Sequence, residues 1–405
     1  MSRATVWAID ASTELHELPH DIHGTVSVST GRLPSAAEVQ ALLDAAYERH
    51  RSVQEGDVAD YIPALARVPA DLFGACIVGA EGSTFTVGDA HHTFSIQSVS
   101  KPFVFALVVQ AIGHEAAREK LGVNATGLPF NSVMAVELNA DRTMNPMVNA
   151  GAIATTSLVP GGTADEKSSH LQDGLSRFAG HPLVLDEEVY ASEAATNLRN
   201  QGIAHLLDSY DRLYFDPDEA TDLYTRQCSL LVTAEDLAVM GATLADGGVN
   251  PITGERVIET RYCKRVLAVM ATAGLYERSG EWMYEIGVPG KSGVSGGIVT
   301  VAPGKGGLGT FSPRLDAAGN SVRGQLLTNE LSERLGLNVY ASSPIIDAMR
   351  AKLDDGVRLG EQSIVMTRSR QTGEWTVGIM GADDGVERGG ASDDDVLDDD
   401  GDTGR

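Results

Sequence analysis

The sequence predicts an α/β (α+β) fold in which a strand-rich half is interrupted by a helical insertion. Two observations lead to this prediction. β-Rich runs occur in "FGACIVGAEGSTFTVGD" and again, late in the chain, in "KSGVSGGIVTVAPG" and "LGTFSPRL". Between them, residues 112–260 contain helical and loop-like patterns with few β-rich runs. The chain therefore begins a sheet, leaves it through helices, and returns to it.

The elements follow in order along the chain. Residues 36–53 carry apolar side chains at helical spacing and predict an amphipathic helix. The first β-rich run has turn residues at Ala80 to Ser83, which predicts a hairpin. An apolar run, "PFVFALVVQAIG", then predicts a buried helix that starts near Ser98. Helices also follow from "KSSHLQDGLSRFAG", "NQGIAHLLDSYDRL", "AEDLAVMGATLADGG" and "GNSVRGQLLTNELSERLG".

These elements divide the chain into four parts. We expect an N-terminal extension at 1–34 and a main domain at 35–343. Its sheet half takes in about 35–111 and 261–343, and its helical insertion about 112–260. A small appendage at 344–380 contains one helix and one or two strands, and 381–405 form an acidic, disordered tail. His16, His20 and His23 could bind a metal, but a mobile arm with unrelated histidines is the favoured interpretation.

Composition excludes several classes of protein. The 405 residues carry a net charge of −25, which argues against nucleic acid and anionic membrane surfaces as partners. No run of eighteen apolar residues and no secretory signal occur. The three cysteines are widely spaced and show no zinc-binding pattern. We therefore expect a cytoplasmic protein without a membrane span, a metal or another cofactor.

The acidity extends beyond the C-terminal tail. Ten acids and one base between Asp383 and Asp402 account for −9, which leaves −16 for the remainder, and 24 arginines accompany only seven lysines. This composition predicts tolerance of concentrated salt, because salt screens repulsion between carboxylates. The alternative is that it reflects the base composition of a genome.

Ser98 and Lys101 lie three positions apart in "FSIQSVSKPF". On a helix this spacing puts both side chains on one face, so the lysine could serve as the base of a serine nucleophile. Serine is also common at ordinary helix starts. The spacing alone leaves both interpretations open.

A second motif, "KSGVSGGI", starts at Lys291 on a predicted strand. An early Ser-x-x-Lys followed by a late Lys-Ser-Gly is the order found in penicilloyl serine transferases. The edge strand could offer the backbone N–H of Val294 to an oxyanion, and the N–H of Ser98 would supply the second donor. A second positive charge at Lys291 would lower the pKa of Lys101 and favour its basic form. Together the two motifs favour catalysis.

Other motifs narrow the reaction. Enzymes acting on β-lactams need a central Ser-x-Asn or Tyr-x-Asn, and neither tripeptide occurs. The chain instead contains "NPMVNAGAI", "YASEAATNLRN", "DLYTRQCSL", "VADYIPALARV", "GLYERSGEW" and "SPRLDAAGNSVRG". With these, it closely resembles the serine-dependent glutaminases of bacteria and mitochondria, over about Ala41 to Tyr340.

The resemblance implies a serine β-lactamase/penicillin-binding-like fold, with an antiparallel sheet flanked by helices and an all-helical subdomain. It implies a nucleophile with its proton-transfer partners (Ser98, Lys101, Tyr276) and an oxyanion hole formed by Ser98 and Val294. It also implies substrate ligands at Tyr61, Ser98, Asn149, Glu193, Asn200, Tyr224, Tyr276 and Val294, with Tyr61 and Tyr224 at the rim of the pocket, and a supporting Lys291. One departure occurs at 197–199, where Asn-Leu-Arg stands in place of Gly-Asp-Arg before Asn200. His91 and His92 carry no implied role.

The chemistry of free glutamine agrees with these positions. Its α-ammonium group requires a carboxylate in a closed pocket, and Glu193 can supply one. Its α-carboxylate can be held by neutral donors such as Asn149, Asn200 and the hydroxyl of Tyr224.

The resemblance thus implies hydrolysis of L-glutamine to L-glutamate and ammonia through a seryl γ-glutamyl intermediate, without a cofactor, in a homo-oligomer (dimer or tetramer). Two alternatives stay open. One is a penicillin-interactive serine acyl enzyme of the same fold, and the other is a non-catalytic glutamine sensor. Release of ammonia from glutamine separates both from a glutaminase.

Overall fold

The computed structural model describes residues 7–8, 32–342, 363–368 and 375–380. Two compact units are distinguished, one of residues 26–342 and one of 1–25 with 343–405. Each is treated by itself below. Among the described residues, none of the helices combines the length and apolar character needed to cross a bilayer.

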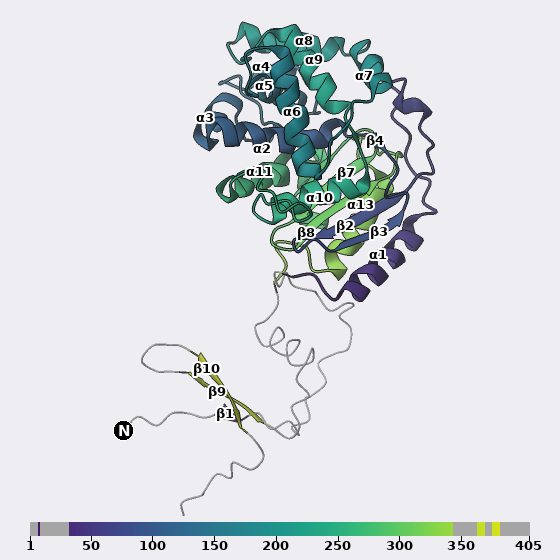
Figure 1. Ribbon diagram of the computed structural model, residues 1–405, viewed down its shortest axis with the longest axis vertical. Helices are drawn as coiled ribbons and strands as arrows, with labels where there is room; N and C mark the ends of the chain where they lie inside the picture. The colour runs from purple at the N-terminus through teal and green to yellow at the C-terminus, as the bar shows by residue number, and fades with distance from the viewer. Residues whose placement is uncertain (1–6, 9–31, 343–362, 369–374, 381–405) are drawn as a thin grey trace, which may run out of the picture. The chain divides into compact units, whose positions relative to one another are not determined.

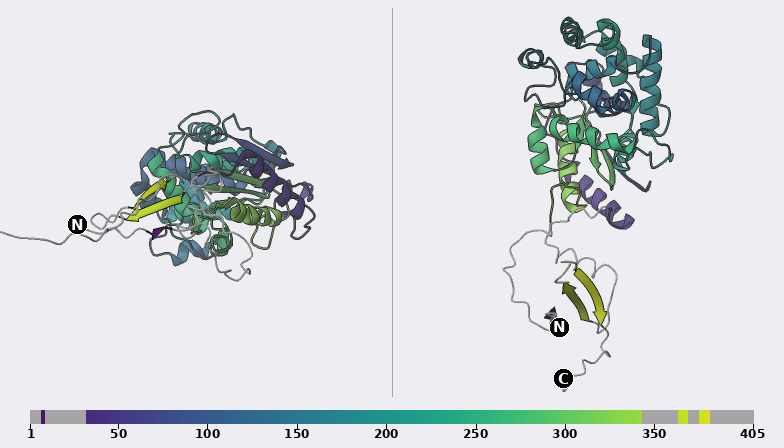
Figure 2. Two further views of the ribbon diagram at one scale, coloured as in Figure 1. Left: turned by 90° about the horizontal axis from the view of Figure 1, so that it is seen from below. Right: turned by 90° about the vertical axis from the view of Figure 1, so that its left-hand side faces the viewer.

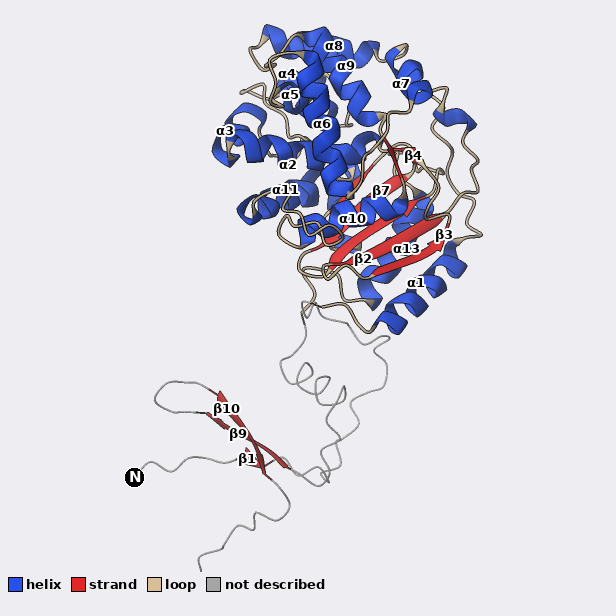
Figure 3. Cartoon of the chain, in the orientation of Figure 1, coloured by secondary structure: helices blue, strands red, loops and turns tan. Residues whose placement is uncertain are grey.

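The larger unit is built on a five-stranded antiparallel sheet (Figures 1 and 3). Its strand order is β3 (Thr84–Gly88), β2 (Gly74–Gly79), β8 (Gly306–Phe311), β7 (Gly297–Ala302) and β6 (Gly290–Ser292). The predicted hairpin is confirmed, since β2 and β3 pair antiparallel with Val78 opposite Thr84. The late strands pair with it through β8 and β2. The chain therefore returns to its first hairpin after a long helical excursion, as predicted.

Helices cover both faces of this sheet. On one face lie α1 (Ala36–His50) and α13 (Val322–Arg334). In α1 the buried residues Val39, Leu43 and Ala46 follow helical spacing, and the helix packs on β3 and on α13. On the other face lies α10 (Ala234–Ala245), which begins with a capping box between Thr233 and Asp236. Although α10 falls within residues 112–260, it packs on β8, β2 and β7.

The remaining helices gather beside the sheet (Figure 2). They are α2 (Lys101–Ile112), α3 (His114–Leu121), α4 (Met134–Leu138), α5 (Asn149–Ser157), α6 (Ala164–Ala179), α7 (Glu187–Ala194), α8 (Leu198–Ser209), α9 (Pro217–Cys228), α11 (Thr260–Ala273) and α12 (Ser279–Glu285). Two short strands, β4 (Phe94–Ser95) and β5 (Leu231–Val232), pair with each other outside the five-stranded sheet. One large buried cluster runs through most of these helices and onto the α10 face of the sheet, where it includes Val299 and Phe311. Trp282 of α12 instead belongs to the cluster formed with α1 and α13.

A buried arginine fixes the long connection between α1 and β2. Arg323 of α13 is 2% exposed, and its guanidinium donates hydrogen bonds to the carbonyls of Ala70 and Leu72 at 2.8 and 2.9 Å. It also donates to Ser312 Oγ at 2.8 Å. Five planar N–H donors suit such a set of acceptors better than a lysine would. The connection, which carries Tyr61, is therefore tied to the end of the sheet.

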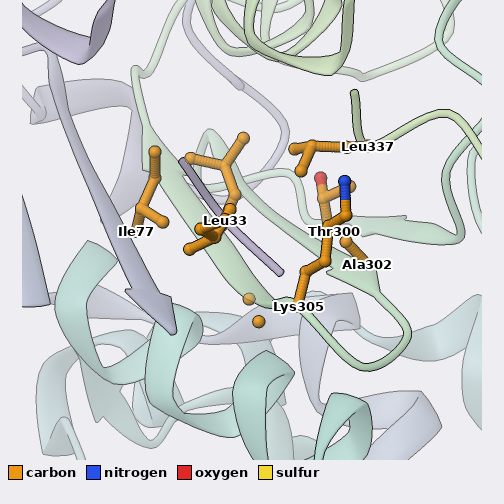
Figure 4. Close-up of a pocket in the computed structure, with 9 residues that line it drawn as sticks. Leu33, Ile77, Thr300, Ala302, Lys305 and Leu337 are labelled. Carbon is orange, nitrogen blue, oxygen red and sulfur yellow. The ribbon is translucent and has the colours of Figure 1, made fainter. Parts of the chain in front are cut away.

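The face of the sheet that α1 and α13 cover holds a small cavity of about 10 Å³ (Figure 4). Leu33, Ile77 and Leu337 line it, together with Thr300 and Lys305. This volume admits about one water molecule and no larger ligand. The cavity therefore does not bear on substrate binding.

The smaller unit contains a three-stranded antiparallel sheet in the order β1 (Trp7–Ala8), β9 (Ser363–Arg368), β10 (Trp375–Met380). One or two strands were predicted for residues 344–380, and the structure contains two there, β9 and β10. Pairing of an N-terminal strand with them was not predicted. The predicted helix after Ser343, the three N-terminal histidines and the acidic tail lie outside the described residues.

Contact between α10 and β8 depends on glycine. A Cβ at Gly309 would lie 2.0 Å from the carbonyl oxygen of Ala234, and one at Gly307 would lie 2.2 Å from that of Ala238. Real Cβ atoms do not approach oxygen so closely, and backbone atoms cannot move away as a flexible side chain can. The helix can therefore rest on the strand only where no Cβ intervenes.

We predict that Gly309→Ala lowers the free energy of unfolding by at least about 2 kcal/mol, because α10 must move off the sheet. Gly202→Ala is the matched control. Gly202 lies on the exposed side of α8, and a Cβ added there would have no neighbour within 4 Å, so alanine should raise stability by about 0.5–1 kcal/mol. Urea unfolding measures both. Equal effects of the two substitutions would contradict the packing argument.

Candidate active site

Ser98 lies in a tight turn that leads directly into α2. The turn is the 3₁₀ segment η2 (Gln97–Ser100), and Lys101 is the first residue of α2. Ser98 is 6% exposed and Lys101 is 1% exposed. The capping interpretation of Ser98 is wrong, because the residue at the helix cap is Ser100. Ser98 therefore has no structural role as a cap.

The residue before Ser98 has an unusual backbone conformation. Gln97 has φ = +50°, in the left-handed region that side chains other than glycine rarely adopt. Such a residue costs about 1–3 kcal/mol and persists only where its surroundings fix it. Its buried side chain supplies that support, since Nε2 donates to Ser95 Oγ and to Glu193 Oε2, both at 3.3 Å. The strained turn therefore links Ser98 to Glu193.

Lys101 is connected to a row of neutral polar groups. Its Nζ donates to Asn149 Oδ1 at 2.8 Å, and the hydroxyl of Tyr224 donates to the same oxygen at 3.3 Å. Asn149 Nδ2 donates in turn to Asn200 Oδ1 at 3.0 Å. The structure thus brings together side chains from α2, α5, α8 and α9, which are more than 100 residues apart at the extremes.

The departure at 197–199 leaves this row intact. Asn197 caps α8, and its Nδ2 donates to Thr225 Oγ1 at 3.1 Å. Leu198 is exposed, and Arg199 Nη1 donates to the carbonyl of Asn131 at 3.4 Å. Asn197 and Arg199 thus bond to groups other than Asn149, and Asn200 keeps its contact with Asn149.

Burial shifts the pKa of both ionisable groups near Ser98. Desolvation lowers the pKa of Lys101 to about 8, while Cys228 and Glu193 oppose this fall. Desolvation raises the pKa of Glu193 to about 7, against the hydrogen bond from Gln97 and the charge of Lys101. At neutral pH, each group therefore exists in both protonation states.

The expected cause of the Lys101 shift was wrong. We predicted that the charge of Lys291 lowers the pKa of Lys101, whereas burial is the main cause. Lys291 is itself fully buried on β6, and burial followed by the charge of Lys101 holds its pKa well below the usual range. The lowered pKa of Lys291 makes it a weaker source of positive charge than the prediction assumed.

Tyr276 lies between Ser98 and Lys291. It has φ = +59°, and its hydroxyl donates to the carbonyl of Ser292 at 3.1 Å. Lys291 Nζ donates to the same carbonyl at 2.6 Å and lies 4.2 Å from the centroid of the Tyr276 ring. Burial raises the pKa of Tyr276, and contacts with Ser98 and Ser292 oppose this rise. Lys291 thus holds a strained tyrosine beside the serine.

Two backbone N–H groups are free near Ser98. Within residues 32–342, neither the N–H of Ser98 nor that of Val294 donates to a protein acceptor. Val294 follows β6 in a tight turn, in which Gly293 N–H bonds to the carbonyl of Gly297 and Gly296 has φ = +101°. Unpaired buried N–H groups are rare, and they are suited to receive a ligand oxygen.

The two tyrosines assigned to the rim differ in exposure. Tyr61 is 54% exposed on the connection tied down by Arg323, as expected for a rim residue. Tyr224 is 2% exposed, so its placement at the rim was wrong. Tyr224 lies inside because α9 packs against α5, α6, α7 and α8, and its hydroxyl bonds to Asn149.

Sequence reasoning missed three neighbours of the site. Gln97 lies within the motif that contains Ser98, but no role was predicted for it. Phe130 packs its ring on Tyr276 at 4.7 Å between centroids, and its carbonyl accepts the N–H of Asn149 at 2.8 Å. Cys228 is buried beside Lys101 and Tyr224, and burial raises the pKa of its thiol to about 12. None belongs to a residue type whose spacing indicates a role.

The described residues contain no group of three or more His, Cys, Asp or Glu side chains arranged to hold a metal ion. The arrangement instead offers a buried serine, a lysine with a lowered pKa, two free N–H donors and one buried carboxylate. This set of groups can support acyl transfer to serine.

Comparison with known proteins agrees with this chemistry. The family model described as Glutaminase matches residues 56–340. Glutaminase 2 of Yersinia pestis is 59% identical over 334 residues, which cover 82% of this chain and 98% of the relative. A probable glutaminase of known structure, ybaS, is 45% identical with a TM-score of 0.75, and the match covers 76% of this chain and 100% of that one.

A third similar structure is that of Mglu in its native form in the presence of 4.3 M NaCl. It is 39% identical with a TM-score of 0.72, and the match covers 76% of this chain and 71% of Mglu. These neighbours have the β-lactamase-like fold, which confirms the predicted fold class. The predicted resemblance is likewise confirmed: this chain belongs to the glutaminase family.

Proposed function

We propose that this protein hydrolyses the side-chain amide of L-glutamine to L-glutamate and ammonia, with Ser98 as the nucleophile. The observation that carries the proposal is the hydrogen bond from Lys101 Nζ to Asn149 Oδ1, at 2.8 Å. It places a lysine of lowered pKa between the serine one turn earlier and a row of amide groups suited to an amino-acid substrate.

Substrate binding follows from the charges and donors present. Glu193 is the carboxylate for the α-ammonium group, since it is 8% exposed and is held by Gln97. Asn149, Asn200 and the hydroxyl of Tyr224 supply neutral contacts for the α-carboxylate. Tyr61 covers the ligand from the rim. The γ-amide is then left to reach Ser98.

The reaction proceeds by acyl transfer. Ser98 attacks the amide carbon while Lys101, with Tyr276, accepts and relays the hydroxyl proton. The N–H groups of Ser98 and Val294 stabilise the tetrahedral oxyanion, and loss of one such donor typically costs about 10²–10³ in rate. Ammonia leaves with the relayed proton, and water hydrolyses the γ-glutamyl ester. Lys291 supports the reaction by positioning Tyr276.

The proposal also includes the domain bounds, the cellular location and the oligomeric state of the enzyme. We assign the glutaminase domain to residues 35–343 and place the protein in the cytoplasm, where its three buried, unpaired cysteines stay reduced. Its active form is a homo-oligomer, either a dimer or a tetramer. Size-exclusion chromatography with light scattering tests that assembly.

Ser98→Ala should abolish turnover and keep the fold, because the change is small and removes the attacking hydroxyl. We expect ammonia release from glutamine in a coupled assay to fall by about 10⁴-fold or more. Acid quenching of the wild-type enzyme should trap a γ-glutamyl ester on the peptide that contains Ser98. An ester on another peptide, or labelling by a fluorescent penicillin without ammonia release, would contradict the proposal.

The rate should rise with pH across the neutral range. Glu193 binds the α-ammonium group only as a carboxylate, with a pKa of about 7, and Lys101 accepts a proton only when neutral, with a pKa of about 8. Both fractions grow with pH, so kcat/KM should increase through these two values. It should fall again where glutamine loses its ammonium proton. A profile that is flat between pH 6 and 9 would exclude both roles.

Lys101→Ala should be nearly as severe as Ser98→Ala, because the hydroxyl loses its base. A variant that retained a tenth of the wild-type rate would show that Lys101 is only structural.

Glu193→Gln should weaken substrate binding while leaving stability nearly unchanged. The substitution keeps the shape and removes the partner of the α-ammonium group, at a cost of roughly 2–5 kcal/mol in kcat/KM. Glu187→Gln is the matched control, since Glu187 is an exposed residue of the same helix. We expect the KM for glutamine to rise only in the first variant. An unchanged KM in Glu193→Gln would exclude the assignment.

The enzyme should also retain its activity in concentrated salt. Net charge is −25, of which the acidic tail accounts for −9. Salt shortens the Debye length from about 10 Å at 0.1 M to about 3 Å at 1 M and so relieves this self-repulsion. Glutamine has no net charge, so screening should not slow its approach. Mglu, a similar protein, was solved in its native form in 4.3 M NaCl.

Activity and melting temperature should therefore be compared at 0.1 M and about 2 M NaCl, for the full chain and for a chain ending at Gly381. Loss of most activity by the full chain at the higher salt would refute the prediction. If only the shortened chain lost it, the tail rather than the body of the protein would be the cause.

A further inference from the structure

A second cavity adjoins the proposed active site without containing its residues. It has a volume of about 290 Å³ and lies between the connection at 64–69, the segment at 92–95 and the start of α7. Cavities that bind small organic ligands begin at about 300 Å³, so this one has room for a molecule of amino-acid size.

The buried residues that line this cavity are apolar except for two serines, whereas His92 and Thr93, which also line it, are exposed. Leu65, Phe94 and Phe311 line it and are buried. Ser295 is 6% exposed, and its Oγ has no hydrogen-bond partner among the described residues. Ser95 Oγ accepts a hydrogen bond from Gln97 and can still donate one. An unsatisfied buried hydroxyl costs free energy, so an oxygen or sulfur acceptor entering here would be stabilised.

The rim of the cavity carries charges of both signs. Arg67 and Glu188 form an ion pair across it, with side chains 61% and 73% exposed. The carboxylate of Asp186 lies at the same edge, where it caps α7. Because the interior holds no charged group, the inner part of a ligand must be uncharged. Its outer part can be both positive and negative.

Because the buried lining is uncharged and the rim carries both charges, we infer that the cavity is a second binding site, for a free L-α-amino acid with an uncharged side chain. The side chain enters toward Ser95 and Ser295. The α-carboxylate bonds to Arg67, and the α-ammonium group lies beside Glu188 and Asp186, so the zwitterion takes up both partners of the existing ion pair. An anion or a cation alone would satisfy only one of them.

This site is coupled to the proposed active site, and this part of the inference rests on the proposed function. Ser95 bonds to Gln97, which bonds to Glu193, and Ser295 directly follows Val294 in the chain. A ligand that orders Ser95 also orders the carboxylate that binds the substrate. Occupancy should therefore lower the KM for glutamine and leave kcat nearly unchanged. The expected factor is about five, the lower end of common coupling between sites.

Titration calorimetry with L-methionine tests the binding itself. Methionine has a flexible, uncharged side chain with a weak acceptor and no amide to hydrolyse. We expect one molecule to bind per chain in the wild type and in Glu193→Gln, and none in Arg67→Leu. Arg51→Leu is the matched control, since Arg51 forms a comparable exposed ion pair with Glu48. Binding lost in Glu193→Gln and kept in Arg67→Leu would place methionine in the active site and refute the inference, as would absence of binding.

Kinetics then test the coupling. Methionine should lower the KM in the wild type and in Arg51→Leu, and it should have no effect in Arg67→Leu, whose KM without methionine stays that of the wild type. A KM raised by methionine in all three proteins would show simple competition and overturn the coupling. Because calorimetry needs no turnover, a protein that binds methionine as expected and releases no ammonia would refute the proposed function alone.

Discussion

The site depends on the burial of one lysine. Lys101 is 1% exposed at the start of α2, and its amino group is 2.8 Å from Asn149 Oδ1. A charged amine in such a place loses its hydration, so the pKa falls to about 8 and a basic form becomes available near neutral pH. The hydrogen bond also joins the first residues of α2 and α5. One interaction thus positions the base and the first contact for the substrate.

Two strained residues flank this lysine, and each is held by its neighbours. Gln97 and Tyr276 both have positive φ angles. Gln97 is held through Ser95 and Glu193, and Tyr276 through the Ser292 carbonyl and the buried Lys291. Strain of this kind is kept only where the surroundings fix the conformation. It leaves the hydroxyl of Ser98 beside the phenol of Tyr276, three residues before Lys101, with two unpaired N–H groups nearby.

Close packing explains why distant segments can meet so accurately. Gly307 and Gly309 let α10 rest on the backbone of β8. Gly151 lets α5 lie against the segment before it, since a Cβ at this position would lie 2.0 Å from the carbonyl oxygen of Asn145. Arg323 ties the connection that carries Tyr61 to the end of the sheet. These contacts fix the relative positions of the helices, so Asn149, Asn200 and Tyr224 converge.

The sequence by itself determined the fold class, the family and the positions that gather around Ser98, because strand and helix periods and short motifs are local properties of a chain. It could not determine burial, because burial depends on residues far away in sequence. The buried position of Tyr224, the lowered pKa of Lys291 and the contacts of Gln97 and Phe130 all follow from packing between separate elements. The cavity beside α7 is likewise formed only when three separate segments meet. Motifs identify the groups of the site, whereas their pKa values and hydrogen-bond partners are set by tertiary contacts, since desolvation and directional bonding act through space.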